Sequence, residues 1–165
     1  MTTRSPSHPP SILRWCLRCV SSTAVIGWMA VIFYLSSLSS EAVATLGLYD
    51  APVFDRLGFF KSVAAHMTVY AALACLIQAA IWSWKTGVGA TLGIAWTAAA
   101  AAGVYGLFDE FHQLFVIGRS VSWMDVGTNA AGAVAAAMAM RFTFKSISPM
   151  LRLGLAVPPG PRRSA

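Results

Sequence analysis

Long, nearly uncharged runs of apolar residues divide the chain, and four of them have the length of a membrane-spanning helix. They cover residues 20–38, 62–84, 88–108 and 126–140, and we extend the last to Phe144. A helix rises 1.5 Å per residue, so roughly 20 residues cross a hydrocarbon core about 30 Å thick. Barrel strands would alternate in polarity, and no such alternation occurs. The pattern predicts an all-α integral membrane protein with four transmembrane helices.

The first run could also be read as the apolar core of a cleaved signal peptide. Such cores are typically about 7–15 residues long, and the run over residues 20–38 is longer and follows an extended basic leader. We therefore expect a retained first helix, although Ala42-Val43-Ala44 keeps cleavage open.

Composition excludes an ordinary soluble domain. Only 11% of the residues are charged and 57% are hydrophobic, whereas soluble domains carry about 25% charged residues. The 12 basic residues outnumber the 6 acidic ones, but a nucleic-acid-binding protein clusters its basic residues on a soluble scaffold. Here long uncharged stretches separate them. We expect membrane lipids as partners, and no nucleic acid.

The distribution of charge predicts the orientation. Nine of the 12 basic residues lie in the leader, in the link between the second and third helices, and in the C-terminal tail, with no acidic residue among them. The other two loops hold all 6 acidic residues together with Arg56, Lys61 and Arg119. Because basic residues favour the cytoplasmic side, both termini are predicted to be cytoplasmic in the cell inner (plasma) membrane.

Three regions follow from this organisation. Residues 1–16 form a disordered basic leader, residues 17–144 form the four-helix membrane domain, and residues 145–165 form a basic, Pro-rich cytoplasmic tail. Both ends have the Ser, Pro and Arg content of disordered segments.

Polar residues recur at helical spacing near the outer ends of three helices, where ionisable groups usually face a bundle interior or a wet cavity. The residues are Ser62, His66 and Tyr70 in the second helix, Gly106, Asp109, His112 and Gln113 in the third, and Asp125, Thr128, Asn129 and Gly132 in the fourth. The polar residues of the third helix share one face if this helix continues to about Phe115. We infer an outward-facing polar pocket among these helix ends.

The segment between the third and fourth helices is predicted to be interfacial or re-entrant. It carries apolar side chains, Trp123 suits the aromatic belt of a membrane interface, and Gly118 can supply a turn. Asp125 then begins the fourth helix, where the helix dipole favours a carboxylate.

At these positions the chain resembles the VanZ-like membrane proteins. The residues that carry the resemblance are Asp109-Glu110-x-His112-Gln113, Gly118-Arg119-Ser120, and Asp125 with Asn129 and Gly132. His66-x-x-x-Tyr70 and Phe33-Tyr34-Leu35-Ser36-Ser37 match as well. The resemblance covers roughly residues 25–140 and implies four helices in the same order.

The chain departs from the family pattern at three positions. Ile117 stands where the family often has Pro, Val63 where it often has Lys, and Val69 where it often has Glu. Lys61, five residues before His66, is therefore not assigned to the site. The match carries over onto His66, Tyr70, Asp109, Glu110, His112, Gln113, Arg119, Asp125 and Asn129.

Two functions remain open for this pocket. The name-giving members of the family are linked to resistance against teicoplanin-type glycopeptide antibiotics, so the resemblance implies a role at the cell envelope.

One hypothesis is recognition of an anionic group on an envelope lipid or cell-wall precursor. The binding residues would be Arg119, Asp125, Asn129, Tyr70 and Gln113. Arg119 is the candidate anion contact, because its planar fork suits phosphate or carboxylate; the equally weighted alternative is a structural salt bridge to Asp109, Glu110 or Asp125.

The other hypothesis is an enzyme that acts on a lipid-linked phosphate. Its catalytic candidates are His66 or His112 as the base, with Asp109 or Glu110 as the orienting partner. The His spacing is not that of a zincin, so we assign no metal and no cofactor, and binding is favoured over catalysis.

Two further patterns have structural interpretations. Cys16-x-x-Cys19 has no second Cys pair and no redox or metal role is assigned to it. Gly127, Ala131 and Ala135 are predicted to pack against a neighbouring helix, because small residues let membrane helices approach closely.

Overall fold

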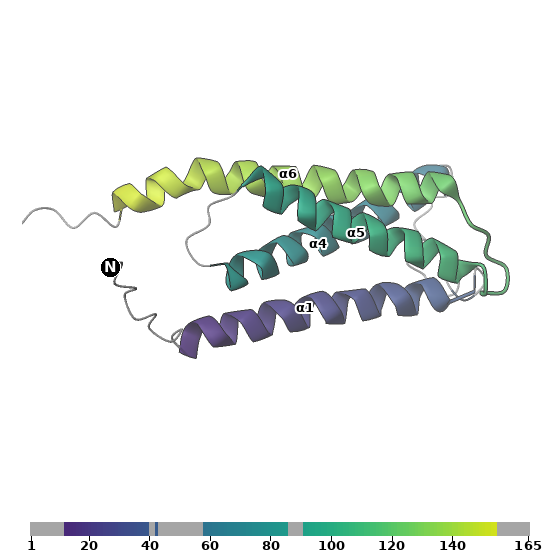
Figure 1. Ribbon diagram of the computed structural model, residues 1–165. Helices are drawn as coiled ribbons and strands as arrows, with labels where there is room; N and C mark the ends of the chain where they lie inside the picture. The colour runs from purple at the N-terminus through teal and green to yellow at the C-terminus, as the bar shows by residue number, and fades with distance from the viewer. Residues whose placement is uncertain (1–11, 40–41, 43–57, 86–90, 155–165) are drawn as a thin grey trace, which may run out of the picture.

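Four helices build the computed structural model, which describes residues 12–39, 42, 58–85 and 91–154. In chain order they are α1 (Ile12–Ser37), α4 (Gly58–Trp84), α5 (Leu92–Gln113) and α6 (Trp123–Gly154). No strand occurs within the described ranges. As Figure 1 shows, the helices run alongside one another, with α1 on one side of the bundle, α6 on the opposite side, and α4 and α5 between them.

Three of the four helices are long and apolar enough to cross a membrane. They are α1, the stretch Ser62–Trp84 of α4, and α5. The prediction of a fourth span needs correction: α6 forms, but its composition does not reach that of a membrane span. Thr128, Asn129 and Arg141 interrupt a stretch of Ala and Gly, and these small residues are much less apolar than Leu or Ile.

Helix ends differ from the sequence-based boundaries by several residues. α1 begins at Ile12, inside the predicted leader, and α6 continues to Gly154, beyond the expected end at Phe144. α5 is capped by Thr91, whose hydroxyl accepts the backbone N–H of Ile94 at 3.3 Å. Its helicity extends to Gln113, so Asp109 and Gln113 do belong to one helix. Residues 1–11 and 155–165 of the leader and tail lie outside the described residues.

Small residues bring α4, α5 and α6 into close contact. Buried Ala side chains from α5 and α6 surround Tyr70 and Leu73 of α4 in the core. The closest approach is at Gly132, where a Cβ atom would lie 2.7 Å from the Cα of Met67 and would also collide with the Met67 carbonyl oxygen. Membrane helices use such positions because backbone contact replaces the missing hydrophobic driving force. Gly132 therefore fixes the distance between α4 and α6.

The predicted packing role of another small-residue stripe is wrong. Gly127, Ala131 and Ala135 are exposed, and an added Cβ at Gly127 would meet nothing within 4 Å. α6 instead buries Gly132, Ala133 and Ala137. Both sets are small residues at helical spacing. The set that packs against the other helices lies on the same face of α6 as the buried Asn129.

Helix α1 is attached to the bundle at fewer points. Only Ile32 and Ser36 of this helix are buried. Trp28 donates its indole N–H to the carbonyl of Val69 at 3.0 Å. Tyr105 of α5 donates its hydroxyl to the carbonyl of Met29 at 2.7 Å. Most of the apolar surface of α1 thus faces outward, as expected of a helix in contact with lipid.

Candidate functional site

Four polar side chains from three helices meet at one end of the bundle. We call them the polar cluster: His66 of α4, Glu110 of α5, and Asp125 and Asn129 of α6. His66 Nδ1 lies 3.0 Å from Asn129 Oδ1, and His66 Nε2 lies 3.9 Å from Asp125 Oδ2. Asp125 and Asn129 are one turn apart on α6, so both side chains can contact His66.

Glu110 connects the polar cluster to the loop that precedes α6. Its side chain is 1% exposed. One carboxylate oxygen accepts a hydrogen bond from the Gln113 side chain and the other from the backbone N–H of Ser122, each at 3.3 Å. Ser122 in turn caps α6, because its hydroxyl accepts the backbone N–H of Asp125 at 3.3 Å. The start of α6, and with it Asp125, is therefore held against Glu110.

The hydrogen bond to Asn129 determines how His66 can act. With the carboxamide oxygen of Asn129 facing the ring, Nδ1 of His66 is the donor. The other ring nitrogen, Nε2, faces Asp125 at 3.9 Å. Asn129 is fully buried, so its carboxamide cannot exchange this partner for bulk water. His66 is thus held with Nε2 directed at a carboxylate.

A second polar group lies behind the cluster, around Tyr70 and Asp109. The Tyr70 hydroxyl, Asp109 Oδ1 and Asn129 Nδ2 are buried and make no hydrogen bond to another protein group. The Asp109 carboxyl is close to the Tyr70 hydroxyl without reaching hydrogen-bond geometry. Gly106 makes room for this group, because a Cβ there would lie 3.1 Å from both the Tyr70 ring and Asn129 Cβ. Buried polar atoms are normally hydrogen-bonded, so this arrangement is unusual for a purely structural core.

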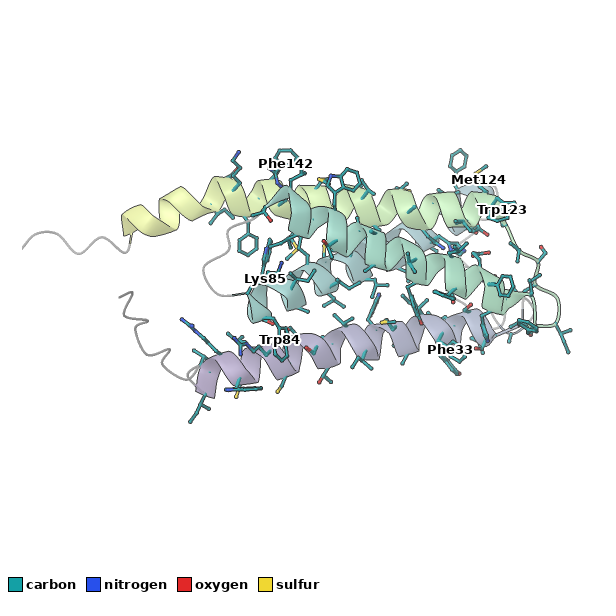
Figure 2. All side chains as sticks on the ribbon, viewed as in Figure 1. Phe33, Trp84, Lys85, Trp123, Met124 and Phe142 are labelled. Atoms are coloured by element: carbon teal, nitrogen blue, oxygen red, sulfur yellow. The ribbon has the colours of Figure 1, made fainter. Side chains whose placement is uncertain are left out.

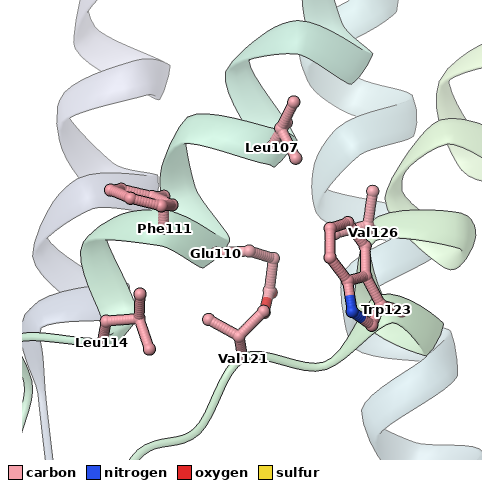
Figure 3. Close-up of a pocket in the computed structure, with 7 residues that line it drawn as sticks. All are labelled: Leu107, Glu110, Phe111, Leu114, Val121, Trp123 and Val126. Atoms are coloured by element: carbon pink, nitrogen blue, oxygen red, sulfur yellow. The ribbon is translucent and has the colours of Figure 1, made fainter.

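An apolar cleft opens beside Glu110 between α5 and α6. Its volume is about 230 Å³. Figure 3 shows its lining: Leu107, Glu110, Phe111 and Leu114 from α5, Val121 from the loop, and Trp123 and Val126 from α6. Glu110 is the only ionisable residue among them. The cleft is therefore an apolar surface that lies directly beside a buried residue of the polar cluster.

Comparison with known proteins identifies the family. The profile of the VanZ/LLP1 family matches residues 22–145, which is most of the chain. The protein belongs to the VanZ/LLP1 family. Neither the search of curated proteins nor that of solved structures found a match. The family match confirms the resemblance inferred from the motif residues, and the matched range includes every residue of the polar cluster.

Most of the motif residues of this VanZ/LLP1 protein converge in the structure. The residues that lie in or directly beside the polar cluster are His66, Tyr70, Asp109, Glu110, Gln113, Asp125 and Asn129. The structure also brings together one set of possible metal ligands, in which donor atoms of His66, Glu110 and Asp125 all lie within 4.8 Å of one another.

Two motif residues take other positions. The His112 ring packs against Phe33 of α1, with ring centroids 4.4 Å apart. Arg119 donates its Nε–H to the carbonyl of Leu38, just past the end of α1, at 3.2 Å. Within the described residues, no ion pair joins Arg119 to Asp109, Glu110 or Asp125, so the predicted salt bridge is not observed. The Lys61 side chain lies outside the described residues.

Sequence reasoning missed the role of Ser122. This residue both caps α6 and binds Glu110. Its signal was present in the sequence, because Ser followed three residues later by an acidic residue at the start of a helix is typical of a capping box. No comparable sequence pattern indicates the hydrogen bond of Arg119 to a backbone carbonyl.

Proposed function

We propose that this VanZ/LLP1 protein binds the polar end of an amphipathic membrane lipid, either an envelope lipid or a lipid-linked cell-wall precursor. The observation that carries the proposal is the continuity of the apolar cleft with Glu110 and, through it, with the polar cluster. A hydrocarbon chain fits an apolar cleft on a lipid-facing helix surface, and the polar head then lies over the cluster. Such sites combine apolar walls with a few placed polar groups.

Different residues contact different parts of the ligand. Leu107, Phe111 and Trp123 contact the chain of the ligand, and Asp125 and Asn129 orient its head through hydrogen bonds. Tyr70 and Gln113 support these residues from behind. Arg119 contacts an anionic group of the head, and this role is compatible with its bond to Leu38, which uses only Nε and leaves the terminal nitrogens of the fork for phosphate or carboxylate. Arg119 also lies on the loop whose Val121 lines the cleft.

The topology that suits this function places the polar cluster on the outer side and both termini in the cytoplasm of the inner membrane. The supporting observation is that Lys85, Trp84 and Phe142 lie toward one end of the bundle and Trp123 and Phe33 toward the other (Figure 2). Trp123 begins α6, the helix that carries Asp125 and Asn129 of the polar cluster. In this arrangement α6 packs against α4 and α5, which shield its polar face.

Site-directed labelling tests this topology. In a chain whose three cysteines are replaced, Ser120→Cys places a thiol at an exposed position just before α6, and Ser146→Cys places one at an exposed position in the C-terminal part of α6. We expect an impermeant maleimide to label Ser120→Cys in intact cells and Ser146→Cys only after permeabilisation. Equal labelling of both in intact cells would reject the proposed orientation.

Lipid co-purification tests the binding function. Leu107→Trp fills the cleft, and Leu92→Trp is its matched control, because both leucines lie on α5 and are 47% and 48% exposed. We expect purified wild-type protein and Leu92→Trp to retain the same envelope lipid by mass spectrometry, and Leu107→Trp to lose it. Arg119→Ala should lower retention of an anionic lipid more than Arg119→Lys does, since Lys keeps the charge but lacks the fork. Equal retention by both leucine variants would reject the cleft as the binding site.

Antibiotic protection tests the same binding in cells. If the ligand is a cell-wall precursor, expression should raise tolerance to a teicoplanin-type glycopeptide, and Arg119→Ala should remove the effect although the protein still inserts. Full protection by a correctly inserted Arg119→Ala variant would exclude Arg119 as the anion contact.

A second candidate function is catalysis on a lipid-linked phosphate. The observation in its favour is the position of the His66 imidazole, which lies beside the Asp125 carboxylate and is held by Asn129, so that a titratable base and a carboxylate share one site. His66 is the better base than His112, whose ring packs on Phe33 outside the cluster. Product release from lipid-phosphate substrates by the wild type and its abolition in His66→Ala would establish an enzyme; absence of turnover in the wild type would leave the binding function alone.

A further inference from the structure

We propose that His66, Glu110 and Asp125 bind a divalent transition-metal ion, which goes beyond the lipid-binding function. The three residues come from three different helices, and their donor atoms lie within 4.8 Å of one another. First-row ions hold their nitrogen and oxygen ligands at about 2.0–2.2 Å, so donors on one ion lie about 3–4 Å apart. The 3.9 Å between His66 Nε2 and Asp125 Oδ2 already falls in this range, and a bound ion would draw the Glu110 carboxylate closer.

The partners of the three ligands are those that a metal site requires. A metal-binding His normally donates its other ring N–H to a carboxylate, a carbonyl or water, which fixes the tautomer and the orientation of the ring. Here the buried Asn129 accepts from Nδ1 at 3.0 Å, and Nε2 is directed at Asp125. Glu110 is likewise held by the Gln113 side chain and the Ser122 backbone. Both shells of the site are therefore built.

Charge balance also favours a cation. Two carboxylates are gathered at a site where Glu110 is 1% exposed and the neighbouring cleft is apolar. Burying carboxylates without a counter-charge is costly. Of the described side chains, His66 is the only cationic partner within ion-pair distance of either, and it is 3.9 Å from Asp125. A divalent ion at this position compensates both negative charges.

The donor set selects the kind of ion. One imidazole and two carboxylates suit Zn²⁺, Mn²⁺ or Fe²⁺, whereas Mg²⁺ and Ca²⁺ prefer oxygen ligands alone and Cu⁺ prefers thiolates. Three protein ligands leave a fourth position open on a tetrahedral ion. That position accepts an anionic oxygen, so the ion would provide a positive charge in a site whose own ionisable side chains are mainly acidic.

The test measures metal binding to the full chain in phosphatidylcholine nanodiscs, prepared without a polyhistidine tag. The background carries Cys16→Ser and Cys19→Ser, because these exposed thiols could bind zinc at the far end of α1. With Zn²⁺ or Co²⁺ as the probe, we expect one ion per chain and a Co²⁺ visible spectrum of nitrogen and oxygen ligands. Mg²⁺ at the same concentration should not displace it.

Variants assign the ion to these residues. His66→Ala and Asp125→Asn should each weaken Zn²⁺ binding by more than the about 10–100-fold typical of losing an outer partner, and Asn129→Ala by about that amount. His112→Ala is the matched control, since it removes a histidine that packs on Phe33 outside the ligand set. It should bind Zn²⁺ like the background. Glu110→Gln, which keeps the size of the buried side chain, tests the third ligand.

Several results would overturn the proposal. Absence of bound Zn²⁺ in the folded background protein, equal binding by His66→Ala, or displacement by equimolar Mg²⁺ would each reject the site. If His66→Ala does not fold, His66→Gln gives the same comparison. The measurement contains no envelope lipid, and Leu107→Trp should not change it. Failure of the metal site is therefore distinguishable from failure of lipid binding.

Discussion

Helices α1 and α6 are both long enough to cross a membrane, yet they differ in composition and in what surrounds them. α1 is strongly apolar and buries only Ile32 and Ser36. α6 is built mainly of Ala and Gly, falls below the hydropathy of a span, and packs tightly on α4 and α5. The comparison shows that the composition of a helix in this bundle follows how much of its surface contacts the other helices. A helix that faces other helices can be small and polar instead.

The two helices are also held to the bundle by different contacts. α1 is joined at separate points by single hydrogen bonds, such as those of Trp28 and Tyr105 to backbone carbonyls. α6 is joined by backbone contact at Gly132 and by the Asn129–His66 pair. Substitutions should therefore have larger effects on α6 than on α1, and the following predictions run from the largest effect to the smallest.

Gly132→Ala should be the most damaging small change in the chain. The added Cβ collides with the backbone of Met67, which cannot move without displacing α4. Overpacking typically costs about 1–3 kcal/mol, and a clash with backbone should reach the upper end. The control is Gly127→Ala on the same helix, where nothing lies within 4 Å; it should be neutral or stabilise by up to about 1 kcal/mol. Unfolding in mixed micelles measures both, and equal stability of the two variants would contradict the proposed contact.

Ile32→Ala and Ile26→Ala compare the two faces of α1. Ile32 is 3% exposed and Ile26 is 67% exposed. Removing the buried side chain leaves a cavity and should lower the free energy of unfolding by about 2 kcal/mol. Lipid replaces the side chain lost at Ile26, so that variant should stay within about 0.5 kcal/mol of wild type. The same unfolding assay checks both, and a larger effect at Ile26 would mean that this face of α1 contacts protein.

Tyr105→Phe should have the smallest measurable effect. It removes the 2.7 Å hydrogen bond to Met29 but keeps the ring. A net loss of about 0.5–1.5 kcal/mol is typical of one hydrogen bond. Tyr34→Phe, on an exposed side chain of α1, is the control and should be silent. An unchanged unfolding midpoint in Tyr105→Phe would show that this bond does not hold α1 in place.

The sequence was sufficient to predict much of the fold and most of the site. Apolar runs located all four helices, because lipid-facing and core positions are both apolar. The helical spacing of polar residues placed His66, Tyr70, Asp109, Asp125 and Asn129 on converging faces. Three of the predicted spans form helices that are long and apolar enough to cross a membrane. These inferences depended only on periodicity and length, which a single chain displays directly.

Other features depended on contacts between helices that no local pattern specifies. Arg119 pairs with a backbone carbonyl, and every residue has one, so its partner at Leu38 left no trace in the sequence. His112 lies near the end of α5, where a small rotation decides whether it faces the cluster or Phe33. The choice between the Gly127 and Gly132 stripes likewise depends on which face meets α4.

The position of the polar cluster has a consequence for biosynthesis. His66 belongs to the second helix that enters the membrane, whereas Asn129, its hydrogen-bond partner, follows 63 residues later. Because synthesis proceeds from the N-terminus, α4 and α5 reach the bilayer with His66 and Glu110 unsupported by α6. α6 in turn does not reach the composition of a membrane span and packs on α4 and α5. A nascent chain that stalls before α6 therefore leaves His66 without its hydrogen-bond partner.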